Sequence, residues 1–117
     1  EDRVDLFKAA DIVLFPSRLD CFGIVVLEAW ISGKPVIGCW SGGMPDMIRD
    51  GENGFLVSWG DTAALTNRIE ILLTDREAGR IMGGNGRKDV LDRWTWDKVT
   101  DRFYRRLSQC CPEVNRQ

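Results

Sequence analysis

The sequence contains no histidine among its 117 residues. This absence excludes a Ser-His-Asp triad, a Cys-His pair and a histidine-ligated metal site. Acid–base or electrostatic chemistry must therefore come from carboxylates, lysine, arginine, backbone amides or a substrate. The sequence also lacks a basic excess, since 16 Lys and Arg stand against 18 Asp and Glu, for a net charge of −2. Domains that bind nucleic acids are normally basic, so we expect no nucleic-acid partner.

Long apolar runs and cysteines are scarce as well. No apolar run approaches the ~18 residues that a membrane-spanning helix needs. The four cysteines, at positions 21, 39, 110 and 111, form no CxxC pair, so we expect no disulfide framework and a cytoplasmic location. The remaining composition, 44% hydrophobic and 29% charged, is typical of one globular domain.

Short apolar runs alternate with helical patterns along the chain. Strands are predicted at 11–15, 35–39 and 55–57, and the first run is typical of a strand buried on both faces. Helices are predicted at about 3–10, 22–32 and 45–49, and for about thirteen residues after the N-cap Asp61. A helix from about Arg76 is expected to be interrupted by Gly83, Gly84 and Gly86. Thr95 is expected to cap a last helix that turns Trp96, Val99, Phe103 and Leu107 inward.

This alternation predicts an α/β fold with a parallel sheet and helices on both faces. Three strands are too few for a complete doubly wound domain. We therefore expect an incomplete Rossmann-like domain over residues 1–109 and a tail over 110–117. The chain begins at Glu1, in what reads as a helix, which is typical of a fragment of a longer protein.

The loop from Pro16 to Gly23 follows the first predicted strand and leads into a predicted helix. Ligands of open α/β sheets bind at this kind of place. The backbone amides of Gly23, Ile24 and Val25 would be unpaired donors at the helix N-terminus, which suits a phosphate group. Asp20 and Glu28 flank that terminus, and carboxylates suit vicinal sugar hydroxyls. The residues alone leave another interpretation open, with Asp20 as an ordinary loop acid and Glu28 paired with a lysine.

Three motifs follow one another between residues 16 and 57. They are Pro16-Ser17-x-x-Asp20-x-Phe22-Gly23-x4-Glu28-Ala29-x3-Gly33-x-Pro35-Val36, then Gly42-Gly43-x-Pro45-Asp46, then Gly54-Phe55-Leu56-Val57. Together they resemble the donor-binding (C-terminal) domain of retaining two-Rossmann-domain (GT-B) glycosyltransferases of the group 1, family 4 type. The resemblance covers nearly all of residues 3–108. It implies transfer of a sugar from a nucleoside diphosphate sugar to an acceptor hydroxyl, with retention at the anomeric carbon.

The resemblance also implies a role for each matching residue. Asp20 stands where the family has its first glutamate, as the catalytic position near the hydroxyls of the donor sugar. The backbone of Phe22 and Gly23 would lie against that sugar, the Ile24 and Val25 amides would hold the diphosphate, and Glu28 would bind the ribose. No metal and no other cofactor is implied. The leaving diphosphate would help deprotonate the acceptor, which fits a site with no histidine.

The family's acceptor domain and its phosphate-binding arginine and lysine lie upstream of the residues present here. The acceptor (a sugar, a lipid or a small molecule) and any peripheral membrane contact would therefore come through that N-terminal domain. We expect the 117 residues alone to be inactive. The alternative is a non-catalytic nucleotide-sugar-binding or interaction module derived from the family. Trp30 is expected in the core, whereas Trp40 and Trp59 follow strand ends on the ligand side.

Overall fold

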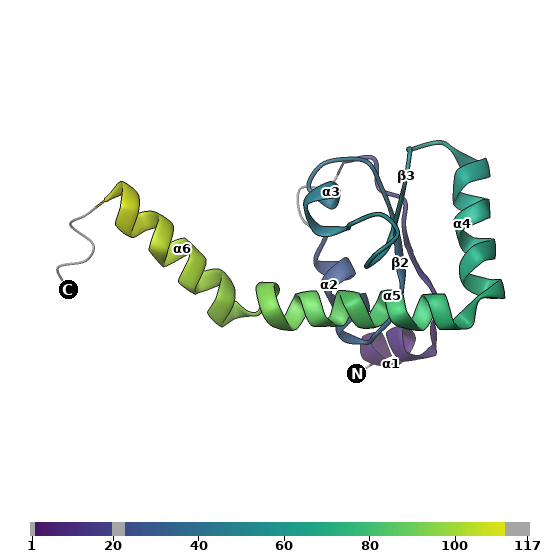
Figure 1. Ribbon diagram of the computed structural model, residues 1–117, viewed down its shortest axis with the longest axis horizontal. Coiled ribbons are helices and arrows are strands. Elements are labelled where there is room, and N and C mark those ends of the chain that lie inside the picture. Colours follow the sequence, from purple (N-terminus) through teal and green to yellow (C-terminus); the bar gives the residue numbers. More distant parts are fainter. Residues whose placement is uncertain (1, 20–22, 112–117) are drawn as a thin grey trace.

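The computed structural model describes residues 2–19 and 23–111, and Figure 1 shows how their elements are arranged. Helices and strands alternate as the sequence predicts. In chain order they are α1 (Asp2–Ala9), β1 (Val13–Phe15), α2 (Ile24–Ile31), β2 (Val36–Cys39), α3 (Met44–Met47), β3 (Phe55–Val57), α4 (Thr62–Thr74), α5 (Arg76–Asp89), the π-helical turn η1 (Val90–Trp94) and α6 (Trp96–Cys110).

The three strands form one parallel sheet in the order β1-β2-β3. Val13 pairs with Val36, and Ile37 pairs with Phe55. Every residue of the central strand β2 is buried, as expected for a parallel strand with helices on both sides. The sheet is therefore the parallel one that the strand–helix alternation predicts.

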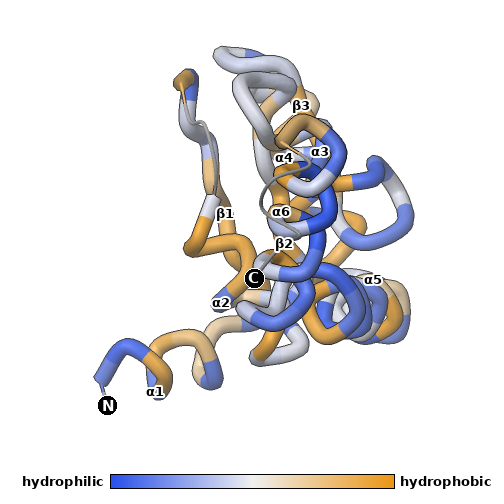
Figure 2. The backbone as a smooth tube through the Cα atoms, turned by 90° about the vertical axis from the view of Figure 1, so that its left-hand side faces the viewer, coloured by the Kyte–Doolittle hydropathy of each residue, from blue (hydrophilic) through white to orange (hydrophobic). Residues whose placement is uncertain are grey.

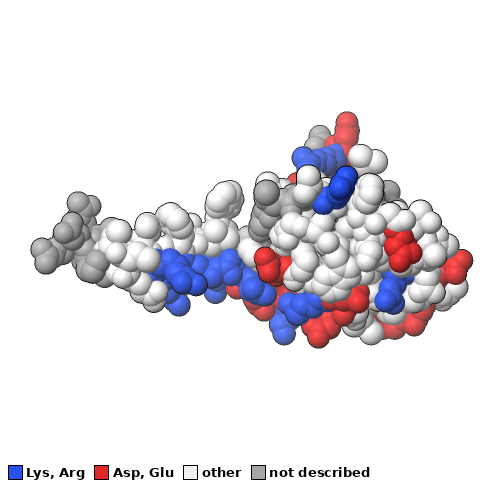
Figure 3. All heavy atoms as spheres, turned by 90° about the horizontal axis from the view of Figure 1, so that it is seen from above, with Lys and Arg blue, Asp and Glu red and all other residues white. Residues whose placement is uncertain are grey.

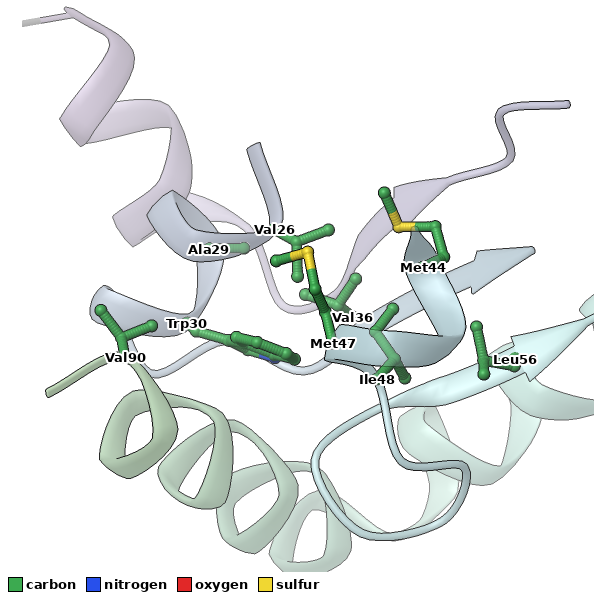
Figure 4. Packing of buried hydrophobic residues seen from close by; sticks show 9 residues of the cluster. All are labelled: Val26, Ala29, Trp30, Val36, Met44, Met47, Ile48, Leu56 and Val90. Carbon is green, nitrogen blue, oxygen red and sulfur yellow. The ribbon is translucent and has the colours of Figure 1, made fainter. Parts of the chain in front are cut away.

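Two apolar clusters cover the two faces of the sheet, which confirms helices on both sides. Side chains of β2 alternate between the clusters because successive residues of a strand point to opposite faces. The α2-side cluster, shown in Figure 4, consists of Val26, Ala29, Trp30, Val36, Met44, Met47, Ile48, Leu56 and Val90. The α4-side cluster consists of Ile37, Cys39, Phe55, Val57, Leu72 and Met82.

Strand β1 is an edge strand, and the prediction that it is buried on both faces is wrong. Val13 and Phe15 pack against the α2-side cluster. Leu14 faces the other side of the sheet and stays 43% exposed, since α4 packs on β3 at the far edge. Figure 2 shows the apolar stretch of β1 at the outer side of the sheet.

Helix α5 runs without a break from Arg76 to Asp89, so the interruption expected at its glycines does not occur. Two of these glycines lie where α5 crosses other parts of the chain. A Cβ atom on Gly83 would overlap the backbone of Gly33, and one on Gly86 would overlap the ring of Trp30. The glycines therefore serve close packing of α5 on the end of α2 and do not end the helix.

Helix α6 leads away from the sheet as an isolated rod (Figure 1), and the expected inward packing of its apolar residues is wrong. No residue of α6 is buried, and Trp96 and Phe103 are 86% and 63% exposed. The guanidinium of Arg102 lies 5.0 Å from the ring centroid of Trp94 and donates a hydrogen bond to the Arg93 carbonyl (2.7 Å). Basic side chains form a row along this helix (Figure 3).

Within residues 2–19 and 23–111, no helix is long and apolar enough to cross a membrane.

Candidate functional site

The carboxyl ends of the parallel strands meet at one edge of the sheet, where the connecting loops lead into helices. The loop after β1 leads to α2, and its first part is held in place. Ser41 in the loop after β2 donates a hydrogen bond from Oγ to the Ser17 carbonyl (2.8 Å), and the Ser17 amide donates to the Phe15 carbonyl (2.9 Å). In open α/β sheets ligands bind at this edge, at helix N-termini.

Among residues 2–19 and 23–111, no side chain caps the N-terminus of α2. Gly23 is the N-cap residue with φ −87° and ψ 84°, and its carbonyl accepts the amides of Val26 (3.0 Å) and Leu27 (3.4 Å). The amides of Ile24 and Val25 come before the first intrahelical bond and have no acceptor within the helix. Ile24 is 61% exposed, and the first turn holds no acidic residue. Within the described part of the chain, two backbone donors and the positive end of the helix dipole are thus available to an anion.

Gly23 is buried and lies against the side chain of Met44 at the start of α3. A Cβ atom at this position would lie 2.5 Å from the terminal methyl of Met44 and 3.0 Å from Cγ2 of Val26. The start of α2 therefore packs closely against α3, which follows the neighbouring strand. The loop between β2 and α3 turns at Gly42, whose φ of 53° is one that residues with a side chain rarely adopt. Gly42 therefore shapes this loop.

Glu28 lies one turn inside α2 and forms a two-pronged ion pair with Arg3 of α1. Nε of Arg3 lies 2.8 Å from Oε2 of Glu28, and an Nη atom of Arg3 lies 2.8 Å from Oε1. The Arg3 side chain is 65% exposed and that of Glu28 is 30% exposed. The partner of Glu28 is thus an arginine 25 positions upstream, and not a lysine.

The structure brings four of the predicted site residues to the same helix. Gly23, Ile24 and Val25 form the N-terminus of α2, and Glu28 follows about 6 Å further along, at 1.5 Å per residue. Asp20 and Phe22 lie outside the described residues, so their predicted roles stay predictions. Sequence reasoning missed Arg3, because no local pattern links residues on two different helices.

The tryptophans divide as predicted between core and edge. Trp30 is fully buried and donates a hydrogen bond from Nε1 to the Asn53 carbonyl (2.9 Å). Trp40 and Trp59 are 54% and 58% exposed beyond the ends of β2 and β3. The guanidinium of Arg18 lies 5.0 Å from the ring centroid of Trp59. Beside this pair is a hollow of about 240 Å³ between the end of β3 and the start of α4.

The cysteines that the structure describes are all free. Cys39 is buried in the α4-side cluster, and this burial raises the pKa of its thiol. A raised pKa keeps the thiol protonated and a poor nucleophile. Cys110 and Cys111 are exposed, and Cys21 lies outside the described residues. Cys39 is therefore a packing residue.

A parallel sheet whose edge presents an uncapped helix N-terminus is the arrangement with which α/β proteins bind nucleotides and other phosphate-containing ligands. Residues 1–89 match the family described as "Glycosyl transferases group 1". The chain belongs to this family. The match and the fold confirm the prediction that the three motifs are those of a GT-B glycosyltransferase.

Three curated relatives illustrate the similarity. The chain is 35% identical over 104 residues to N-acetyl-alpha-D-glucosaminyl L-malate synthase of Bacillus anthracis, covering 88% of this chain and 27% of that protein. It is 41% identical over 83 residues to D-inositol 3-phosphate glycosyltransferase of Nocardia farcinica, covering 71% of this chain and 18% of the relative. It is 34% identical over 100 residues to sulfoquinovosyl transferase SQD2 of Arabidopsis thaliana, covering 83% of this chain and 19% of the relative. The chain thus spans about a quarter or less of these relatives.

Solved structures show the same fold. Sucrose-phosphate synthase from Thermosynechococcus elongatus is similar with a TM-score of 0.79 and 33% identity, over 90% of this chain and 27% of that one. HepE of Anabaena in complex with UDP is similar with a TM-score of 0.82 and 28% identity, over 89% of this chain and 29% of that one. A further HepE structure, in complex with UDP-glucose, has a TM-score of 0.79 and 27% identity over 89% of this chain and 29% of that one.

Proposed function

We propose that this chain is the donor-binding part of a retaining glycosyltransferase that moves a sugar from a nucleoside diphosphate sugar to an acceptor hydroxyl. The observation that carries the proposal is the N-terminus of α2, where the Ile24 and Val25 amides have no acceptor within the helix and no side chain of the described residues caps them. Similarity to HepE, whose structures hold UDP and UDP-glucose, supports a nucleotide sugar as the ligand.

The proposed contacts follow the geometry of α2. The diphosphate lies against the Ile24 and Val25 amides, and the backbone of Phe22 and Gly23 lies against the donor sugar. Glu28 accepts hydrogen bonds from the ribose hydroxyls about one helical turn away. Asp20 interacts with the hydroxyls of the donor sugar at the catalytic position, and no metal takes part. The leaving diphosphate assists deprotonation of the acceptor, so no histidine is needed.

The other half of the reaction belongs to parts outside these residues. We propose that the acceptor is bound by an N-terminal domain of the full protein, because the chain spans only 27% of the first relative.

We also propose a cytoplasmic location. Free Cys39, Cys110 and Cys111 support it, because thiols stay reduced in the cytoplasm.

Glu28→Gln is expected to weaken binding of the preferred nucleoside diphosphate by about tenfold, because hydrogen bonds to a charged acceptor contribute about 1.5–3 kcal/mol. Calorimetric titration of the full protein with UDP, GDP and ADP measures this and identifies the nucleotide. Glu77→Gln is a matched control, since Glu77 pairs with Arg80 on the surface of α5. Equal affinity of the Glu28→Gln protein and the control would contradict the ribose role.

The 117-residue chain alone is expected to release no nucleoside diphosphate from UDP-glucose, GDP-mannose or ADP-glucose. The helix that would hold the diphosphate follows the edge strand β1, so only one wall of a donor cleft is present, and ligand sites are normally enclosed clefts. The assay measures UDP, GDP or ADP by chromatography beside the full protein. Turnover by the isolated chain would refute this prediction, and an inactive full protein that still binds the nucleotide would favour a non-catalytic binding module.

A further inference from the structure

We propose that Arg3 is a positioning residue that orients the carboxylate of Glu28 for a nucleotide ribose. This inference rests on the proposed function and adds a residue to that site. Arg3 approaches Glu28 with two nitrogens, each 2.8 Å from a different carboxylate oxygen. Two parallel contacts of this kind fix the plane of a carboxylate, which a single contact does not.

The arrangement leaves room for a ribose. A carboxylate has about four acceptor positions, two on each oxygen. The guanidinium of Arg3 occupies one position on each oxygen, so one position on each stays available for the two vicinal hydroxyls of a ribose. The Glu28 side chain is 30% exposed, so it is partly accessible from solvent. Arg3 therefore preorganises the acceptor without blocking it.

Charge gives Arg3 a second effect at the same place. Glu28 lies about 6 Å along α2 from the amides that are proposed to hold the diphosphate. An unpaired carboxylate at that distance would repel the diphosphate, because like charges at a partly exposed site interact appreciably. The guanidinium of Arg3 offsets this repulsion. The first turn of α2 has no acidic residue, and its last turn has no basic one, so α2 itself supplies no such compensation.

The pair contributes little to the fold. Arg3 is 65% exposed, and exposed ion pairs add little to stability. Helix α1 buries no residue. Replacing Arg3 therefore leaves the folded chain intact, so binding can be measured on a native protein. A role limited to joining α1 to α2 would leave the selectivity for ribose unchanged.

The test compares a nucleoside diphosphate with its 2′-deoxy counterpart, by calorimetry on the full protein with whichever of UDP, GDP or ADP binds. The variants are Arg3→Gln, Arg3→Lys and Glu28→Gln. The control is Arg76→Gln, because Arg76 is about as exposed as Arg3 and forms an ion pair with Asp11 between two other segments. The readout is the ratio of the two dissociation constants, which reports the hydroxyl contact and is insensitive to general changes in stability.

We expect the unmodified protein to prefer the ribose form by about tenfold. Arg3→Gln should lower this preference about threefold, because it frees the Glu28 rotamer. Arg3→Lys should give a preference between those of the unmodified protein and Arg3→Gln, because it keeps the charge and loses the two-pronged contact. Arg76→Gln should leave the preference unchanged. If Arg3→Gln matches the control while Glu28→Gln loses the preference, the inference is overturned and the proposed function stands. Tighter binding by Arg3→Gln would also overturn it, by showing that Arg3 blocks the site. If Glu28→Gln keeps the preference, the inference is overturned together with the proposed ribose contact of Glu28.

Discussion

Gly83→Ala is expected to lower the free energy of unfolding by about 3 kcal/mol, since an inserted methyl with no room forces backbone shifts. A Cβ atom at Gly83 would overlap the carbonyl of Gly33 and lie 3.0 Å from the carbonyl carbon of Lys34. These are backbone atoms at the end of α2, so no side-chain rotation relieves the overlap. Either α5 moves away from the sheet or the turn at Gly33 distorts.

Gly84 provides the matched control, because it is the next residue of the same helix and a Cβ atom there would point into open space, with no neighbour within 4 Å. Gly84→Ala is expected to raise the free energy of unfolding by about 0.5–1 kcal/mol, the usual gain of alanine over glycine in a helix. Urea denaturation of the chain, followed by circular dichroism, measures both. Equal shifts for the two variants would show that α5 does not pack closely at Gly83.

Elements whose ends are set by nearby residues were predictable from the sequence. Asp61 accepts the Ala64 amide (3.0 Å) at the start of α4, and Thr95 caps α6. Gly33 follows the end of α2 with φ 73°, a conformation that favours glycine. Each of these features depends on residues within one helical turn. The local sequence is therefore sufficient to predict where these helices begin or end.

Features that depend on distant segments were not predictable. The glycines of α5 predict helix breaks because glycine disfavours helices, but packing against Trp30 and Gly33 outweighs that preference. The apolar residues of α6 follow a helical period, and this period does not reveal whether a partner covers them. In the same way, the apolar run of β1 predicts burial on both faces, although only one face is covered.

The candidate site also combines a feature that the local sequence predicts with one that depends on distant segments. The position of the N-terminus of α2 after the first strand was predictable because a strand, a loop with glycine and an apolar helix follow one another in sequence. The ion pair between Arg3 and Glu28 joins two helices, and its distances come only from the packing of α1 beside α2. The residue proposed to orient the ribose-binding carboxylate could thus be found only from the structure.

Asn53→Ala is expected to lower the free energy of unfolding by about 2–4 kcal/mol, because it removes three hydrogen bonds at a fully buried position, one of them to the buried Met47 carbonyl. Asn53 is fully buried. Its Nδ2 donates to the Met47 carbonyl (3.1 Å) and to Oδ2 of Asp89 (2.8 Å), and its Oδ1 accepts the Arg49 amide (2.7 Å). The side chain therefore ties the end of α3 and the turn before β3 to the end of α5.

Two further variants distinguish the loss of these three hydrogen bonds from a general effect of replacing an asparagine. Asn85 is exposed and donates one hydrogen bond to the Glu52 carbonyl (2.9 Å), so Asn85→Ala should cost about 0.5 kcal/mol or less. Asn53→Asp keeps the acceptor for the Arg49 amide but turns a carboxylate oxygen toward Asp89 and the Met47 carbonyl, so it should destabilise at least as much as Asn53→Ala at neutral pH. Thermal and urea denaturation of the three variants measure these differences. If Asn53→Ala costs no more than Asn85→Ala, the junction of α3, β3 and α5 does not depend on this side chain.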